Sequence, residues 1–240
     1  MARMVPGLPV DALQALIRER SPLSPTETEA VIANRFAAPP RRLQAALERW
    51  PLGSKRVLDV GCSYGHCLVR FGPGSVGLDT NPEHVEFCRS LGLDARLLDV
   101  DEGLESLPDG AFDFAWASDV VEHLDSPRLL LRRLRPKLAP GGRLIVFLTV
   151  LPRSRLLRAA LRRRGANPFD SGAHHYQFTL ETARYLVERA GYRLESAYAP
   201  PVPGPLVAQA PRLFLEASVD ERTDAIAAAA ERKNKPEPSE

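Results

Sequence analysis

The sequence predicts an α/β protein: a doubly wound, mostly parallel sheet of seven strands with an N-terminal helical cover. Short apolar runs such as Val57–Val60 alternate with segments of helical periodicity through residues 54–150. An N-cap residue followed by proline marks two expected helix starts, Asn81-Pro82 and Ser126-Pro127. Strands that alternate with helices imply right-handed crossovers, which build a parallel sheet covered on both faces.

The other elements follow the same signals in chain order. Apolar residues at helical spacing predict helices within residues 9–50, which either cover a sheet edge or cap a ligand site. Strands are expected at 57–60, 75–78, 192–198 and 212–219. We therefore divide the chain into a helical cap, 1–53, a main domain, 54–222, with an insertion or lid at 151–178, and a C-terminal helix and disordered tail, 223–240.

Composition narrows the class of protein. With 240 residues, 44% of them hydrophobic, the chain can form one domain with a sizeable core. No apolar run approaches the roughly 18–20 residues of a membrane span, and Met1 to Leu8 lack the apolar stretch of a secretory signal. Three cysteines, without the paired spacing of a zinc site, predict no disulfide framework, no metal and a cytoplasmic protein.

The segment from Val57 to Gly65 carries the strongest functional signal. Gly61 and Gly65 bracket a tight turn, expected to lead into a helix, where a ligand can approach bare backbone because no Cβ stands in the way. Asp79 ends the second strand at the same edge of the sheet, where an acid can accept hydrogen bonds from a ribose. The pattern predicts a nucleoside-containing ligand at the carboxyl ends of the strands.

The spacing disfavours a dinucleotide. Its fingerprint needs glycines at the third and sixth positions of the turn, where this chain has Ser63 and His66. Asp59, two residues before the first glycine, would repel a phosphate but suits a cationic ammonium group.

These residues resemble the first motif of the class I S-adenosylmethionine-dependent methyltransferases, Asp-x-Gly-x-Gly-x-Gly, with Ser63 in place of the middle glycine. The stretches ending at Asp99 and running from Asp109 through His123 are similar to the family's third and fourth strands. Leu134 to Leu144 is similar to its helix, turn and fifth strand. The resemblance covers roughly residues 55–200, with several motifs in register.

The resemblance implies a Rossmann-like methyltransferase fold, in which the strand at 212–219 is the antiparallel one, and S-adenosylmethionine as cofactor. Expected cofactor-binding residues are Asp59, Gly61, Cys62, Ser63, Gly65, Asp79, Thr80, Asn81, Asp99, Val100, Ser118 and Asp119. Methyl transfer from a sulfonium is an in-line displacement, so the protein chiefly aligns the reactants and excludes water. We expect a small-molecule acceptor, with a hydroxyl favoured over an amine.

A hydroxyl acceptor benefits from a base, and histidine is the usual candidate near neutral pH. His123 ends the motif after the fourth strand, and His174, His175 and Tyr176 lie in the segment before the last helix; these four are the catalytic candidates. Each could instead orient a loop or face solvent. His84 is expected to be a solvated surface residue.

Residues 151–165 combine six arginines with leucines and hold no acid. A basic helix with leucines on its other face can lie on an anionic membrane or bind nucleic acid. The simplest interpretation is instead a solvated helix whose leucines pack on the domain. Binding of an anionic acceptor, such as a lipid-linked molecule, is the next interpretation, and binding of RNA is the last. Nucleic acid is disfavoured because the net charge is only +2 and no aromatics interleave with the arginines. An RNA methyltransferase and a catalytically silent cofactor-binding subunit are the alternative functions; the Asn-Pro-Pro-aromatic motif of many base-methylating enzymes is absent at Ser118 to Val121.

Overall fold

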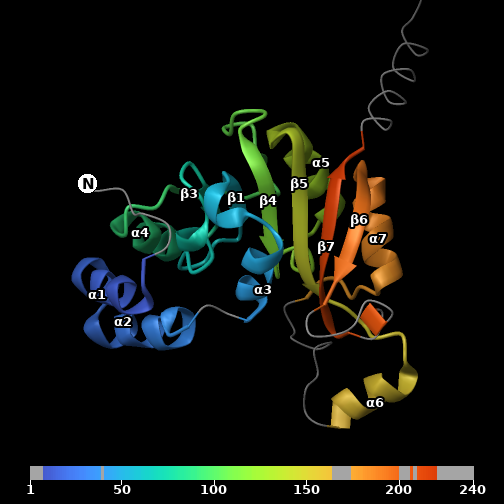
Figure 1. The fold of residues 1–240 in the computed structure, drawn as a ribbon, viewed down its shortest axis with the longest axis horizontal. Coiled ribbons are helices and arrows are strands. Elements are labelled where there is room, and N and C mark those ends of the chain that lie inside the picture. The colour runs from blue at the N-terminus through green and yellow to red at the C-terminus, as the bar shows by residue number, and fades with distance from the viewer. Residues whose placement is uncertain (1–7, 39–40, 164–173, 200–205, 208–209, 221–240) are drawn as a thin grey trace, which may run out of the picture.

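The computed structural model describes residues 8–38, 41–163, 174–199, 206–207 and 210–220. One seven-stranded sheet has the order β3-β2-β1-β4-β5-β7-β6 (Figure 1). The strands are β1 (Val57–Val60), β2 (Val76–Asp79), β3 (Ala95–Leu97), β4 (Phe112–Ser118), β5 (Leu138–Thr149), β6 (Tyr192–Tyr198) and β7 (Arg212–Val219). All neighbouring pairs from β3 to β5 are parallel, whereas β7 is antiparallel to both β5 and β6. The predicted fold class and the antiparallel last strand are confirmed.

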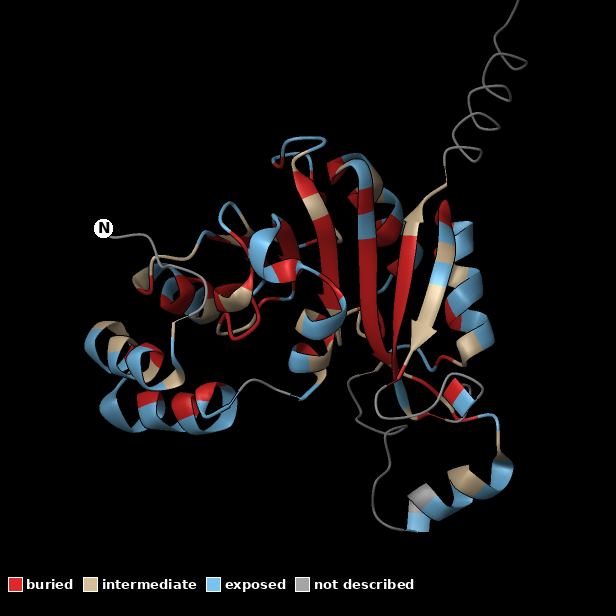
Figure 2. Cartoon of the chain, viewed as in Figure 1, coloured by how far each residue is buried: buried red, intermediate tan, exposed pale blue. Residues whose placement is uncertain are grey.

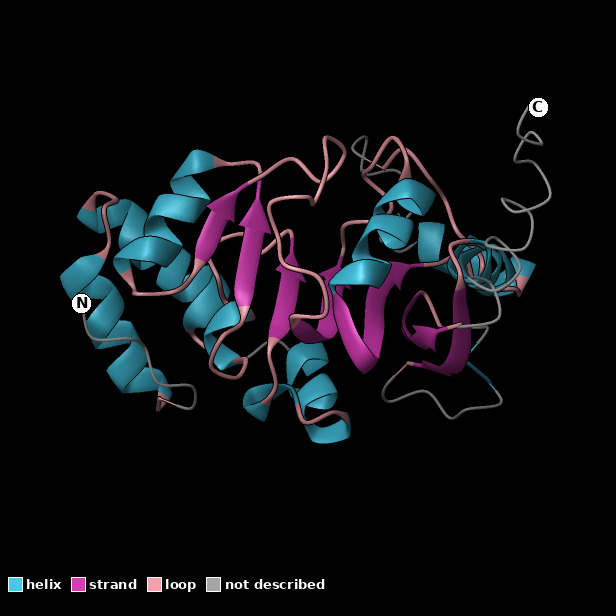
Figure 3. Cartoon of the chain, turned by 90° about the horizontal axis from the view of Figure 1, so that it is seen from above, coloured by secondary structure: helices cyan, strands magenta, loops and turns pink. Residues whose placement is uncertain are grey.

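Helices cover both faces of the sheet (Figure 3). They are α1 (Val10–Arg20), α2 (Pro25–Val31), the π-helical η1 (Ile32–Phe36), α3 (Arg41–Arg49), α4 (Pro82–Ser90), α5 (Pro127–Leu134), α6 (Arg155–Arg163) and α7 (Leu180–Arg189). Short 3₁₀ turns are η2 (Leu52–Ser54), η3 (Leu68–Arg70) and η4 (Arg135–Lys137). The expected Asn81 cap is present, because its side chain accepts a hydrogen bond from the Glu83 N–H. Ser126 precedes Pro127 as expected but makes no side-chain cap.

The sheet separates two apolar layers. On one face, leucines of α5 and residues of α7 such as Val187 pack on β1, β2, β4 and β5. On the other face, α3 and Trp50 pack against Trp116, Phe147 and Phe214. The inner strands β1, β2 and β4 are almost continuously buried, as expected for parallel strands covered on both sides, whereas the edge strands β3 and β6 are partly exposed (Figure 2).

Helix α6 stands apart from the sheet (Figure 1). Leu156 is 84% exposed, so the expectation that the leucines of this segment pack on the domain is wrong for that residue.

The N-terminal helices lie beside the glycine turn. Leu13, Ile17 and Phe36 form a buried cluster with Phe87 of α4, and Tyr64 of the turn packs against it. α3 instead packs on the sheet through Leu43. The division into cap, main domain and tail stays a prediction, and residues 223–240 lie outside the described part of the chain.

The prediction of a helix directly after the glycine turn is wrong. Only the 3₁₀ turn η3 forms there. Phe71 is followed by Gly72-Pro73-Gly74, and these residues stop a helix before it can complete a second turn. Between Gly65 and the next strand the chain is therefore a compact loop, pinned by buried Leu68 and Val69.

Candidate active site

The carboxyl ends of β1 and β2 border a cavity of about 120 Å³. Its lining is almost wholly apolar and comes from Val60, Gly61, Leu78, Asp79, Thr80, Leu98, Val100, Val120 and Leu124. The sheet order reverses between β1 and β4, and ligands of open α/β sheets bind at such a switch point. Four of the expected cofactor-binding residues, namely Gly61, Asp79, Thr80 and Val100, line this one cavity.

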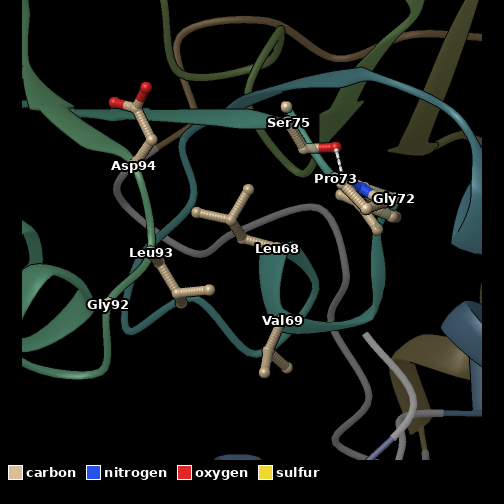
Figure 4. A pocket seen from close by; sticks show the side chains of 10 residues that line it. Leu68, Val69, Gly72, Pro73, Ser75, Gly92, Leu93 and Asp94 are labelled. Atoms are coloured by element: carbon tan, nitrogen blue, oxygen red, sulfur yellow. Dashed lines mark hydrogen bonds between the residues drawn. The ribbon is translucent and has the colours of Figure 1, made fainter. Parts of the chain in front are cut away.

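A second cavity, of about 50 Å³, lies at the opposite end of β2 (Figure 4). Ser75 and Asp94 border it, and the Ser75 hydroxyl donates a hydrogen bond to the Gly72 carbonyl at 2.7 Å. It lies at the amino ends of β2 and β3, away from the predicted site.

Backbone geometry opens the glycine turn toward the cavity. Gly61 (φ 71°), Ser63 (φ 50°) and Gly65 (φ 75°) all adopt left-handed conformations. A Cβ at position 61 would lie 2.7 Å from Cγ2 of Val120, so a side chain is excluded there by both sterics and conformation. Ser63 tolerates the conformation while donating its backbone N–H to Asp79 Oδ2 at 2.7 Å.

Asp79 contacts several polar groups at the carboxyl ends of the strands. Its Oδ1 accepts the Asn81 N–H at 2.9 Å and lies 3.1 Å from His84 Nδ1, while Oδ2 accepts the Ser63 N–H. A carboxylate offers about four acceptor positions, so Oδ2 keeps one for a ribose hydroxyl. A second hydroxyl could bind Oδ1 only by displacing His84.

The expectation that His84 is a solvated surface residue is wrong. Rather than facing solvent, it contacts Asp79, and its ring meets the Tyr64 ring edge-on at a centroid distance of 4.4 Å. The spacing from Asp79 could have revealed this, because Asn81 and Pro82 start α4 and place residue 84 in its first turn, beside the strand end.

Asp59 is fully buried at the end of β1. Its Oδ2 has no hydrogen-bond partner among the described residues. Burial, reinforced by the negative charge of Asp79, raises the pKa of the Asp59 carboxyl well above its usual value. A cation placed nearby would stabilise the ionised carboxylate, so this orphaned oxygen is chemically matched to an ammonium group.

The remaining residues expected to bind the cofactor differ in burial and in their hydrogen bonds. Cys62 packs in the core, and its N–H and carbonyl bond to Leu78 and Gly65, so it supports the turn. Asp99 is exposed after β3 and accepts the Asp101 N–H. The Ser118 hydroxyl donates to Asp119.

The four catalytic candidates lie beyond the ends of β4 and β5, where they form two separate groups. The rings of His123 and His174 pack edge to face with centroids 4.6 Å apart. His175 Nδ1 lies 3.1 Å from Asp125 Oδ1, and the Tyr176 hydroxyl donates to the Asp125 carbonyl at 2.9 Å. Burial and the neighbouring His123 lower the pKa of His174, so its imidazole is neutral near pH 7.

Glu122 was missed by the sequence interpretation. It is buried, its Oε1 accepts the Thr149 N–H at 3.3 Å, and its carbonyl accepts the backbone N–H groups of His175 and Tyr176. Burial raises the pKa of the Glu122 carboxyl. The residue therefore joins β4, the end of β5 and the segment that carries His174. Its position in the motif directly before His123 was the available signal.

Two arginines from distant parts of the chain converge on Asp119. Arg42 Nη1 lies 3.4 Å from Asp119 Oδ2, Arg212 pairs with Oδ1, and Asp119 adopts a left-handed φ of 55°. Both guanidiniums lie over the Phe147 ring, at 5.5 and 4.9 Å from its centroid. His66 lies in the same field: burial and the charges of Arg35 and Arg42 lower its pKa to about 4.

Comparison with known proteins decides the family. A family model described as a methyltransferase domain matches residues 31–197. A ubiquinone biosynthesis O-methyltransferase of Xanthomonas euvesicatoria pv. vesicatoria (strain 85-10) is 31% identical over 170 residues, covering 65% of this chain and 70% of that protein. The chain belongs to the methyltransferase-domain family.

Further matches agree with this methyltransferase assignment. A relative of the same name from Xanthomonas oryzae pv. oryzae (strain PXO99A) is 31% identical, but the match spans only 64% of its length. A solved S-adenosylmethionine-dependent methyltransferase from Thermotoga maritima has a TM-score of 0.58 at 21% identity, with 85% of this chain and 99% of that chain covered. One from Archaeoglobus fulgidus has a TM-score of 0.55 at 21% identity, covering 74% and 93%. These two structures support the fold.

The methyltransferase depends on S-adenosylmethionine, and the residues present fit that cofactor. The apolar lining of the cavity suits the adenine ring, Asp79 Oδ2 has an acceptor position for the ribose, and buried Asp59 suits the ammonium group. Among the described residues, no cluster of three or more His, Cys, Asp or Glu side chains could hold a metal ion. Within those residues, too, no helix is long and apolar enough to cross a membrane.

Proposed function

We propose that this methyltransferase methylates a hydroxyl group of a small molecule that carries a negative charge, in the cytoplasm. The observation that carries the proposal is the His123–His174 pair at the carboxyl ends of the strands, in which His174 has a lowered pKa. Two relatives named as O-methyltransferases support transfer to oxygen. The three cysteines, all free and buried, support a reducing compartment.

The cofactor supplies an activated methyl group on a sulfonium, so the chain's own residues need to align the acceptor and remove its proton. An imidazole nitrogen of neutral His174 would accept the proton that the acceptor hydroxyl loses when its oxygen takes the methyl group from the sulfonium sulfur. His123 holds the His174 ring from its edge, and Glu122 fixes the backbone of the next two residues. The lid predicted at 151–178 stays a prediction, and residues 164–173 of it lie outside the described structure.

The negative charge on the acceptor is inferred from Arg42 and Arg212. Two guanidiniums share the single carboxylate of Asp119, which leaves positive charge in excess beside the histidines. Stacking on Phe147 fixes their planes. A carboxylate or phosphate on the acceptor could accept their remaining N–H groups, which are rigidly presented for such a planar contact.

Arg212→Gln is expected to raise the KM of an anionic acceptor by about 10–100-fold, with little change in kcat, because one charge-assisted hydrogen bond is lost. The KM of a neutral analogue should not change. Arg143→Gln is the matched control, since Arg143 also lies in the sheet and pairs with Glu216, at the other end of β5. Equal losses for the charged and neutral acceptors would contradict the charge assignment.

Release of S-adenosylhomocysteine, measured with matched acceptors, tests the function itself. A phenol bearing a carboxylate, the corresponding aniline and total RNA should be compared. We expect turnover with the phenol. Turnover with RNA alone would establish the RNA alternative, and cofactor binding without turnover on any acceptor class would favour the silent subunit.

A further inference from the structure

The segment that follows β3 forms one wall of the cofactor cavity. Leu98 and Val100 line that cavity, and Val100 is only 7% exposed. Residues 98–103 all lie within the described structure, and they form neither helix nor strand. The segment is joined to the sheet where the Leu98 N–H donates to the Asp79 carbonyl at 3.0 Å. Beyond Leu98 the chain leaves the sheet, so the position of Val100 has to be set by another contact.

Arg133, in the last turn of α5, makes that contact. Its Nη1 donates to the Asp101 carbonyl at 2.7 Å and to the Val100 carbonyl at 3.3 Å. Both hydrogen bonds are partly buried, and a donor that carries charge makes them stronger than bonds between neutral groups. The guanidinium therefore links α5 to the cavity wall through the backbone of the wall itself.

The helix that carries Arg133 is firmly held. Leu130, Leu131 and Leu134 are fully buried in the core, and the Tyr192 hydroxyl donates to the Leu131 carbonyl at 2.9 Å. Because the core is close-packed, the backbone beside Arg133 cannot shift without disturbing these contacts. A fixed helix that presents a planar, forked cation can determine where a neighbouring loop lies.

We propose that Arg133 is a positioning residue of the cofactor site. By holding the Val100 and Asp101 carbonyls, it keeps the Val100 side chain against the nucleoside part of S-adenosylmethionine. Without Arg133, two partly buried carbonyls lose their donor, and the segment moves until water reaches them. The proposal rests on the placement of the cofactor in this cavity, and it does not depend on which acceptor is methylated.

Two simpler roles for such a cation are present in the same region. Basic residues in the last turn of a helix interact with its free carbonyls, and exposed Arg132 supplies the same charge beside Arg133. Lys137 holds a later part of the loop, because its Nζ donates to the Leu107 carbonyl at 2.9 Å and to Asp109 at 2.7 Å. Neither Leu107 nor Asp109 is among the described residues that line the cofactor cavity. These two residues therefore provide matched comparisons for Arg133.

Titration of the full chain with S-adenosylhomocysteine and with 5′-methylthioadenosine tests the proposal. The second ligand lacks the amino-acid end, so its affinity reports on the nucleoside side alone. Arg133→Met keeps the apolar stem and removes the N–H donors, and we expect the Kd of both ligands to rise by about 10–100-fold. Arg133→Lys keeps an ammonium donor and should recover most of the affinity for both.

Arg132→Met and Lys137→Met are the matched controls. Arg132→Met removes the same charge from an exposed position in the same turn, so both Kd values should stay within about twofold of the wild type. Lys137→Met removes a loop contact of the same kind away from the cavity. It should lower the melting temperature while leaving both Kd values within the same limit. Circular dichroism shows whether each variant is folded.

Wild-type affinity for both ligands in a folded Arg133→Met variant would overturn the proposal. A loss for S-adenosylhomocysteine alone would also overturn it, because the nucleoside side would then be intact. Equal losses in Arg133→Met and Lys137→Met would reduce the role of Arg133 to loop stability. Absence of binding in the wild type would instead contradict the cofactor site itself, and the proposal with it.

Discussion

His174→Ala should lower kcat for a hydroxyl acceptor by about 10²–10⁴-fold, the usual effect of removing a general base. The physical reason is the neutral imidazole held against His123. Because the pKa of His174 is lowered from 6.5, the base form persists to mildly acidic pH. The wild-type rate should fall at acidic pH as His174 gains a proton, with its midpoint below the pH at which an unperturbed imidazole titrates.

His175→Ala is the matched control for that prediction. The neighbouring ring is half exposed and faces Asp125 rather than His123, so its loss should change kcat little. Cofactor affinity, measured by calorimetry, should be unchanged in both variants. Loss of cofactor binding in His174→Ala, or equal rates for the two variants, would remove His174 as the base.

Gly61→Val should weaken S-adenosylhomocysteine binding by more than about 100-fold. The added Cβ would meet Val120 at 2.7 Å, in a left-handed conformation that a branched residue tolerates poorly. Val120 lines the cofactor cavity, so any relief of the clash moves a wall of that cavity.

Gly110→Val separates the two effects. Gly110 has a similar φ of 63°, but a Cβ there would meet nothing within 4 Å. This variant should carry the conformational penalty and retain cofactor affinity. Circular dichroism and thermal melting would show whether Gly61→Val remains folded; normal affinity in a folded Gly61→Val variant would place the site elsewhere.

Local sequence signals predicted the elements that build the cofactor side. The tight turn at Gly61 and Gly65, and the acids that end two buried strands, can each be recognised from a few neighbouring residues. Gly61 and Asp79 line one cavity in the structure. The sequence also contains the reason that no helix follows the turn, because Gly72-Pro73-Gly74 would end such a helix almost as soon as it began. The helix was expected because the glycine turn of the family motif leads into one.

Contacts between distant residues could not be predicted in this way. Arg212 and Asp119 are 93 positions apart, and neither has a neighbour in sequence that points to the other. The same holds for Arg42, whose helix reaches Asp119 only because Leu43 and Ala46 bury against the sheet. For α6, periodicity indicated an amphipathic helix correctly, but it cannot tell whether the apolar side meets the domain or solvent.

Titration of S-adenosylhomocysteine and of NAD into the wild type and Asp79→Ala tests the central claim most directly: the crevice at β1 and β2 binds the sulfonium cofactor. We expect the wild type to bind S-adenosylhomocysteine and not NAD. Loss of the charge-assisted ribose contact, worth about 1.5–3 kcal/mol, should weaken binding to Asp79→Ala by about 10–150-fold. Binding of NAD without S-adenosylhomocysteine, or equal affinity in the two proteins, would contradict the account.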